Sequence, residues 1–151
     1  MANPTKPLIS QAKIALLDVI LQNERACYPY PWSKQAIVEC FNGKYQCFVM
    51  SVNDNVVGHL IYQLVVDELH LHNVCLLPDL RGQGLGRRWM EFLLQRAKQE
   101  SAKTIFLEVR VSNSAAIELY QQFDFKTLAI RKNYYRSNSV QEDAKVMSLS
   151  L

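Results

Sequence analysis

The 151-residue chain lacks the features that mark a membrane or secreted protein. Its longest apolar runs, such as residues 60–66, are interrupted by polar residues and fall far short of the roughly 20 residues that a membrane-spanning helix needs. Residues 1–6, which we expect to be flexible, lack the apolar stretch of a secretory signal. We therefore expect a cytoplasmic protein with no membrane partner.

Metal-binding and redox motifs are also missing. The four cysteines include no Cys-x-x-Cys pair, and Cys47 and Cys75 lie in apolar segments, where we expect small buried hydrophobic side chains. His70 and His72 would point to the same face of a strand, but the sequence offers no evident third ligand beside them. We expect no metal.

The charge of the chain is too small to indicate nucleic-acid binding. A net charge of +3 would suit an anionic cofactor or a ribosome-associated partner. The basic residues Arg131, Lys132 and Arg136 are expected in a solvated turn, and the sequence shows no sheet motif that combines aromatic and basic residues. We expect no direct contact with nucleic acid.

What is present is the pattern of one mixed α/β domain, which we take to span residues 1–151. Apolar residues recur at helical spacing over residues 9–24, and Ser33 is placed to cap a short helix that runs through Cys40. An antiparallel meander should follow, and then strands alternating with helices. The expected strands are residues 45–52, 56–66, 69–77, 104–109, 125–130 and 140–149. The expected later helices are an amphipathic one from residue 85 and one over residues 115–122, for which Ser112-Asn113-Ser114 is a natural cap. This order gives a mixed sheet with helices on its faces.

A glycine-rich segment, residues 81–87 (RGQGLGR), joins a strand to the amphipathic helix. Glycine lets a ligand approach the main chain closely, and N–H groups at the start of a helix favour a phosphate. A Walker A loop would need Lys-Ser/Thr, and the Rossmann fingerprint would need glycine at Arg87. Both are excluded, which leaves a different phosphate loop or a glycine-rich turn without a ligand.

The remaining pattern, [QR]xxGx[GA], is matched by Arg81, Gly84 and Gly86 and resembles the pyrophosphate loop of the GNAT acetyltransferases. Further segments in the same order resemble the RimI-type enzymes of that superfamily. These segments are residues 30–33, 73–78, 107–110, 112–120, 131–135 and 142–144. The resemblance implies the GNAT fold, with a central, largely antiparallel mixed sheet flanked by helices.

The resemblance also implies acetyl-CoA as the cosubstrate and assigns residues to it. Main-chain groups of Val74, Cys75 and Leu76 would face the acetyl carbonyl and the pantetheine arm, which Asn113 would also bind. The residues that would hold the pyrophosphate are Gly82, Gln83, Gly84, Leu85, Gly86 and Arg87. Cys75 and Gly82 depart from the family pattern, in which a small residue and a basic residue are common at these positions.

Two residues would carry the chemistry by the same resemblance. Glu108, in an otherwise apolar strand, would be the general base; the alternative is a charge at a sheet end, paired with Arg110. Tyr120 would be the general acid that protonates the departing sulfur. The alternative is a core aromatic beside Phe123 and Phe125.

Candidates for binding the acceptor are aromatic and acidic. Trp32 is a wall of the substrate pocket or an anchor for the first loop. Tyr134 and Tyr135 line a peptide groove or lie on the surface between two strands. Three acidic residues could attract a basic peptide, although two of them, at positions 67 and 68, also fit solvated turn charges. They are Glu24, Asp67 and Glu68.

RimI-type enzymes acetylate N-terminal alanine on a small-subunit ribosomal protein, so that protein or its N-terminal peptide is the expected substrate. An α-amino group has a pKa of about 7.7–8.0 and a lysine about 10.4, so the terminal amine is easier to deprotonate by roughly 3.4 kcal/mol. The alternatives are a GNAT enzyme acting on protein lysines or a small amine, and a non-catalytic protein that binds acetyl-CoA.

Overall fold

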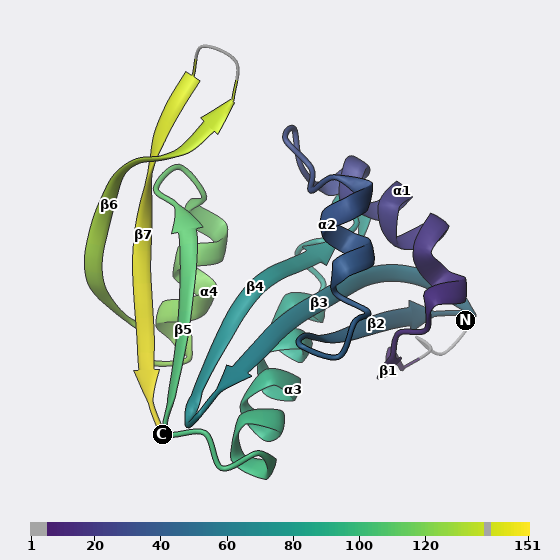
Figure 1. Cartoon of the computed structure of the whole chain (residues 1–151), viewed down its shortest axis with the longest axis horizontal. Coiled ribbons are helices and arrows are strands. Elements are labelled where there is room, and N and C mark those ends of the chain that lie inside the picture. Colours follow the sequence, from purple (N-terminus) through teal and green to yellow (C-terminus); the bar gives the residue numbers. More distant parts are fainter. Residues whose placement is uncertain (1–5, 138–139) are drawn as a thin grey trace. The chain divides into compact units, whose positions relative to one another are not determined.

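The computed structural model describes residues 6–137 and 140–151. These residues contain seven strands in one sheet, in the order β1-β2-β3-β4-β5-β7-β6 (Figure 1). The pairs β1–β2, β2–β3, β5–β7 and β6–β7 are antiparallel and β4–β5 is parallel. The sheet is therefore mixed and mostly antiparallel, as predicted. The strands are β1 (Leu8–Gln11), β2 (Gln46–Val52), β3 (Asn55–Val65), β4 (Glu68–Leu76), β5 (Thr104–Arg110), β6 (Lys126–Ser137) and β7 (Val140–Ser150).

The same described residues contain four α-helices and two short 3-10 helices. They are η1 (Ile14–Leu16), α1 (Leu17–Cys27), α2 (Lys34–Glu39), η2 (Pro78–Leu80), α3 (Leu85–Gln99) and α4 (Ser114–Gln122). The predicted caps are confirmed, because the Ser33 side chain accepts a hydrogen bond from the Ala36 N–H and the Asn113 side chain one from the Ala116 N–H. Within the described ranges, no helix has the length and apolar character needed to cross a bilayer.

The chain forms two compact units. The first contains residues 1–63 and 73–86, and the second contains residues 64–72 and 87–151. The single-domain organisation expected for residues 1–151 stays a prediction. The flexibility expected for residues 1–6 falls, apart from Lys6, outside the described residues.

In the first unit, α1 and α2 contribute apolar side chains to a core shared with strands β2 and β3. Burying such side chains is the main favourable contribution to folding, at about 25 cal/mol per Å² of apolar surface. The buried members are Ile20, Leu21, Ile37, Cys40, Cys47, Val49 and Ile61. Cys47 is a free, buried thiol, which confirms the expectation that it acts as a small hydrophobic side chain.

The predicted helix over residues 9–24 is partly wrong. Leu8–Gln11 is a strand that pairs antiparallel with β2, from Leu8 opposite Ser51 to Gln11 opposite Phe48. A strand of four residues is too short to show a period of its own, and pairing with β2 fixes it instead. The α-helix then begins at Leu17 and continues to Cys27.

In the second unit, β6 is longer than predicted. It runs from Lys126 to Ser137 and forms a long hairpin with β7 (Figure 1). Two irregularities interrupt the pairing, one between Thr127 and Ala129 and one between Arg131 and Tyr135. Asn133, inside the second irregularity, has a φ of 54°, which asparagine tolerates better than most residues. This break in the alternation explains why the sequence favoured a turn where the strand continues.

The strand β5 shows the alternation expected of a strand with one buried face. Ile105, Leu107 and Val109 are buried, while the residues between them are half-buried. Glu108 lies on that second face. The amphipathic helix α3 buries Trp89, Met90, Leu93 and Ala97, which confirms its predicted apolar side.

Candidate active site

The glycine-rich loop lies in the first unit between η2 and the start of α3, as the sequence predicted. Gly82 has a φ of 77° and Gly84 a φ of 85°, values in the left-handed region that side chains strongly disfavour. A Cβ atom at either position would meet no other atom within 4 Å, so the backbone conformation is what requires glycine there. The loop thus brings main-chain N–H groups to a helix start, an arrangement suited to an anion.

The side chains of Arg81 and Gln83 stabilise the loop by donating hydrogen bonds to main-chain carbonyl groups. The Arg81 Nε donates to the Leu76 carbonyl at 3.1 Å, and its guanidinium also donates to the Cys27 carbonyl at 3.5 Å. Gln83 donates to the Asp79 carbonyl at 3.4 Å. Arg81 therefore connects the loop to the ends of β4 and α1 rather than standing as a separate positive charge.

The end of β4 carries the three residues expected to face the cofactor. The Tyr28 hydroxyl donates a hydrogen bond to the Val74 carbonyl. Cys75 is buried, but it forms a disulfide with Cys27, which corrects the expectation of a plain hydrophobic side chain. The partners lie 48 residues apart, so their spacing gave no signal. A Cβ atom on Gly58 would overlap the Cys75 carbonyl oxygen, so β3 and β4 approach closely at this point.

A buried polar cluster in the first unit was not predicted. The Glu24 Oε1 accepts hydrogen bonds from His59 at 3.0 Å and Asn73 at 2.9 Å, and its Oε2 accepts one from the Trp32 N–H at 3.0 Å. Burial raises the pKa of Glu24, but the hydrogen bonds from His59, Trp32 and Asn73 and the charge of His59 bring it below its usual value. The side chain is only 1% exposed, so the suggested role of Glu24 in attracting a basic peptide is wrong.

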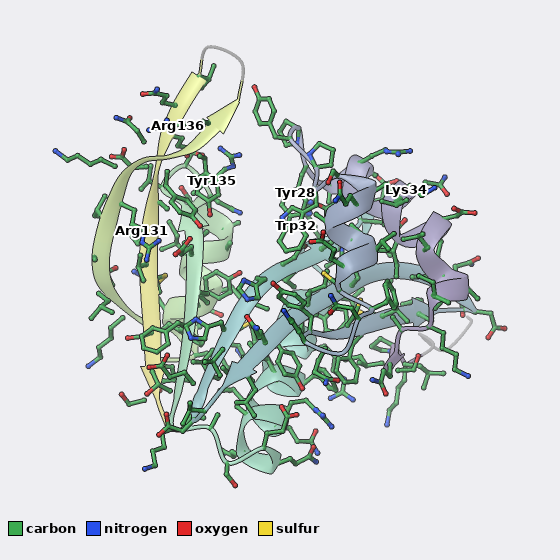
Figure 2. The ribbon with its side chains drawn as sticks, in the orientation of Figure 1. Tyr28, Trp32, Lys34, Arg131, Tyr135 and Arg136 are labelled. Carbon is green, nitrogen blue, oxygen red and sulfur yellow. A yellow bond between two sulfur atoms is a disulfide. The ribbon has the colours of Figure 1, made fainter. Side chains whose placement is uncertain are left out.

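Trp32 lies next to this cluster. Its ring is half-buried and packs against the apolar core that α1 and α2 share, which fits the reading of an anchor for the first loop. Figure 2 labels Trp32 together with Tyr28, both on the segment between α1 and α2. Contact of Trp32 with a substrate stays a prediction.

In the second unit, Glu108 is held by residues of β6. Its Oε1 lies 3.2 Å from the Arg131 guanidinium, and the Tyr134 hydroxyl donates a hydrogen bond to the carboxylate. The alternative pairing with Arg110 is wrong, because Arg110 contacts Glu142 at 3.2 Å. The Glu108 side chain is 27% exposed, so solvent and small molecules reach it.

Tyr134 and Tyr135 lie within β6 rather than in a loop between strands, and Arg131 and Arg136 flank them on the same strand (Figure 2). Their rings meet edge to face at 5.0 Å, and the Arg110 guanidinium stacks 4.2 Å from the Tyr135 ring. The hydrogen bond to Glu108, together with burial and the Glu108 charge, raises the pKa of Tyr134 against the effect of Arg131. Burial, with the charge of Glu108, raises the pKa of Tyr135 to about 12. The basic residues Arg131, Lys132 and Arg136 are exposed, as expected, but they lie in this strand and not in a turn.

Tyr120 is a buried residue of α4. Its ring packs against Phe125 at 5.9 Å, as the core alternative expected, whereas the Phe123 ring lies under the Arg87 guanidinium at 4.9 Å. Burial raises the pKa of Tyr120, and the electrostatic effect of Tyr135 adds to it. The phenol is therefore protonated at neutral pH, the form that a proton donor needs.

His70 and His72 share one face of β4, as predicted. Their rings stack 6.4 Å apart, and His70 also stacks on Phe106 of β5 at 5.3 Å. Glu68, expected as a solvated turn charge, contacts His70 at 3.0 Å, and Asp67 contacts Lys103 at 3.8 Å. In the part of the chain that the structure describes, no three His, Cys, Asp or Glu side chains are grouped to hold a metal ion.

Comparisons with known proteins agree with this architecture. The model of the acetyltransferase (GNAT) family matches residues 17–125. The [ribosomal protein bS18]-alanine N-acetyltransferase of Escherichia coli (strain K12) is 34% identical over 143 residues, which are 95% of this chain and 97% of that enzyme. The enzyme of the same name from Haemophilus influenzae is 32% identical over 145 residues, 95% and 99% of the two chains. The crystal structure of the Escherichia coli ribosomal-protein-S18-alanine N-acetyltransferase superposes with a TM-score of 0.90 at 34% identity, covering 96% of this chain and 94% of that one.

Proposed function

Because the chain belongs to the GNAT family of acetyltransferases, we propose that it acetylates the N-terminal alanine of a small-subunit ribosomal protein. The chain is an acetyl-CoA-dependent N-acetyltransferase, and the acceptor is the subject of the proposal. The observation that carries it is the similarity over almost the full length of both chains to an enzyme named for the bS18 alanine terminus. An acceptor that is a component of the ribosome would place the reaction in the cytoplasm.

The cofactor residues are proposed on the family pattern and on the local geometry of each segment. The left-handed glycines of the loop, with Gln83, Leu85, Gly86 and Arg87, would present N–H groups to the pyrophosphate. Main-chain groups of residues 74–76 would bind the acetyl carbonyl and the pantetheine arm. Asn113, whose Oδ1 caps α4, would donate its amide N–H to the pantetheine. Acetyl-CoA supplies the acetyl thioester, and we propose no metal.

For the chemistry, we propose direct attack of the amine on the thioester. Glu108 would remove the proton of the acceptor amine, directly or through one water, and the amine nitrogen would then form the new C–N bond. As the C–S bond breaks, the Tyr120 hydroxyl would protonate the departing sulfur. The proton that the acylated nitrogen then loses would restore the phenol. Support comes from the solvent access of Glu108 and from the protonated state of Tyr120.

The acceptor peptide is proposed to contact three aromatic residues. Tyr134 is 46% exposed and donates a hydrogen bond to Glu108. A peptide lying on the Tyr134 side chain would therefore reach the proposed base. Tyr135 is half-buried beside it. We propose Trp32 as a third contact, although its ring also anchors the first loop.

A panel of acceptors tests the function. The purified protein is incubated with acetyl-CoA and an alanine-initiated basic peptide, its N-terminally blocked copy carrying lysine, or a small polyamine. Thiol release is followed, and the acetyl group is located by mass spectrometry. Acetylation of the free alanine terminus alone supports the proposal. Comparable turnover of lysine or polyamine overturns the acceptor, and cofactor binding without any turnover points to a non-catalytic acetyl-CoA-binding protein.

A further inference from the structure

The face of β5 that carries Glu108 continues onto β4. The two strands run parallel with Glu68 opposite Thr104, His70 opposite Phe106 and Leu71 opposite Leu107. Buried residues alternate with more exposed ones along both strands, so every second side chain lies on the accessible face. After the stacked pair of His70 and Phe106, the next residues on this face are His72 on β4 and Glu108 on β5.

An ordinary carboxylate is a weak acceptor for the proton of an ammonium group. A glutamate has a pKa of about 4.3 and an α-amino group one of about 7.7–8.0, so the transfer is unfavourable by roughly 3,000-fold. An ordinary imidazole, with a pKa of about 6.5, reduces this gap to roughly 20-fold. The lowered pKa of His72 makes its own gap larger than that. In addition, the Glu108 carboxylate already forms an ion pair with Arg131 and accepts a hydrogen bond from Tyr134. A neighbouring neutral imidazole would therefore complete the proton transfer better than Glu108 alone.

We propose that the proton which Glu108 takes from the acceptor amine moves on to the imidazole of His72. In the first step an N–H bond of the ammonium breaks and an O–H bond forms on Glu108. In the second step that O–H bond breaks and an N–H bond forms on His72. The imidazolium then releases the proton to water, which reaches this exposed side chain. The inference rests on the proposed function, because it takes Glu108 as the base.

The surroundings of His72 keep its imidazole in the accepting form. Partial desolvation and the neighbouring His70 lower the pKa of His72, while the charge of Glu108 acts in the opposite direction. His72 is thus neutral at pH 7, and the nearby carboxylate stabilises the imidazolium once it forms. Within the second unit, the titratable and charged groups on this face are Glu68 and His70 of β4, Glu108 and Arg110 of β5, Glu142 of β7, and Arg131, Tyr134 and Tyr135 of β6.

The kinetic test compares two histidines of one strand face. With the alanine-initiated peptide, kcat is measured from pH 5 to 9 for the wild type, His72→Gln and His70→Gln. We expect His72→Gln to lower kcat at pH 7 by about 10²-fold, the lower end of what general acid–base catalysis contributes. It should also abolish the wild-type fall in kcat at acid pH, which arises as His72 becomes protonated below its lowered pKa. His70→Gln should retain kcat and shift this fall to higher pH, because His70 no longer lowers the pKa of His72.

A second measurement does not depend on turnover. The imidazole signals of His72 are titrated by NMR in the wild type and in Glu108→Gln. Removing the carboxylate should lower the titration midpoint of His72 further, and an unchanged midpoint would overturn the inference. So would a His72→Gln variant that keeps kcat within twofold and retains the acidic fall. If the wild type acetylates no alanine-initiated peptide, the proposed function fails, and the NMR midpoint alone decides whether His72 and Glu108 are coupled.

Discussion

Each unit of the molecule contains a carboxylate with a basic partner, and the two carboxylates lie in opposite environments. In the first unit, Glu24 and His59 are 1% and 0% exposed, and Glu24 accepts three hydrogen bonds from its own unit. In the second unit, Glu108 is 27% exposed and contacts Arg131, which is more than half exposed. Both carboxylates have a basic partner within 3.2 Å, yet only the second can meet a molecule that arrives from solvent.

This difference separates structural from chemical roles better than residue type does. A buried carboxylate that accepts three hydrogen bonds from its own chain holds α1, β3 and β4 in one arrangement. A half-exposed carboxylate beside an arginine and a tyrosine can exchange a proton with a substrate. Removing the buried carboxylate should therefore change stability, and removing the exposed one should change turnover.

The largest expected effect is on turnover when Glu108 is changed. Glu108→Gln removes the proposed base but keeps the shape of the side chain, so we expect kcat/KM for the alanine-initiated peptide to fall by about 10²–10⁴-fold. The midpoint of thermal unfolding should change little, because the Arg131 ion pair is exposed. Steady-state kinetics and calorimetry on the same samples measure both.

The matched control is Glu100→Gln. Glu100 is 23% exposed and lies 3.3 Å from Arg96, so its exposure and its distance from an arginine are close to those of Glu108. It should retain wild-type turnover. Equal losses in both variants would mean that any half-buried ion pair of the unit affects activity, and the role of Glu108 as a base would be withdrawn.

The next largest effect is on stability, when Glu24 is changed. Glu24→Ala leaves His59, Asn73 and the Trp32 N–H buried without their acceptor, and removing one partner of a buried pair costs about 3–5 kcal/mol. Chemical denaturation should show this loss in the free energy of unfolding. Glu39→Ala, on an exposed position of α2, should stay within about 0.5 kcal/mol of the wild type.

The pH dependence of stability provides a second readout for Glu24. Its pKa is lower in the folded state than the ordinary 4.5, so the native state favours the carboxylate. The stabilisation is therefore present above about pH 4.5 and is lost as the pH falls through the folded value. In Glu24→Gln, the free energy of unfolding should depend less on pH below about pH 4.5. An unchanged dependence would show that other carboxyl groups cause it.

The sequence predicted the local structure of both units better than the buried polar cluster inside the first unit. The period of α3, the alternation along β5 and the caps Ser33 and Asn113 depend on neighbouring residues, and a local pattern reveals them. The Glu24–His59–Asn73 cluster joins positions up to 49 residues apart, and no local spacing signals it. The full length of β6 was not predicted for a related reason. Its irregular pairing with β7 interrupts the alternation of buried and exposed side chains that marks a strand.

A smaller loss of stability is expected when the disulfide of the first unit is removed. Closing a 48-residue separation stabilises a fold by about 2–4 kcal/mol, so Cys27→Ser should lower the midpoint of unfolding. A thiol reductant should reproduce the shift in the wild type and leave the variant unchanged. Burial raises the pKa of Cys40 to about 11 and of Cys47 to about 12, so these thiols should resist alkylation at neutral pH. A wild-type midpoint that the reductant does not move would show that the bond adds no stability.

The smallest effects on stability are expected at two N-terminal helix caps, one in each unit. Ser33 caps α2 at 3.1 Å and Asn113 caps α4 at 3.2 Å, and replacing either by alanine should reduce the free energy of unfolding by about 1 kcal/mol. Only Asn113→Ala should also raise KM for acetyl-CoA, because its amide is proposed to bind the pantetheine arm. Measuring KM in both variants separates the two roles, since loss of a cap alone would change the two values equally. Equal KM values would leave Asn113 as a cap and remove it from the cofactor site.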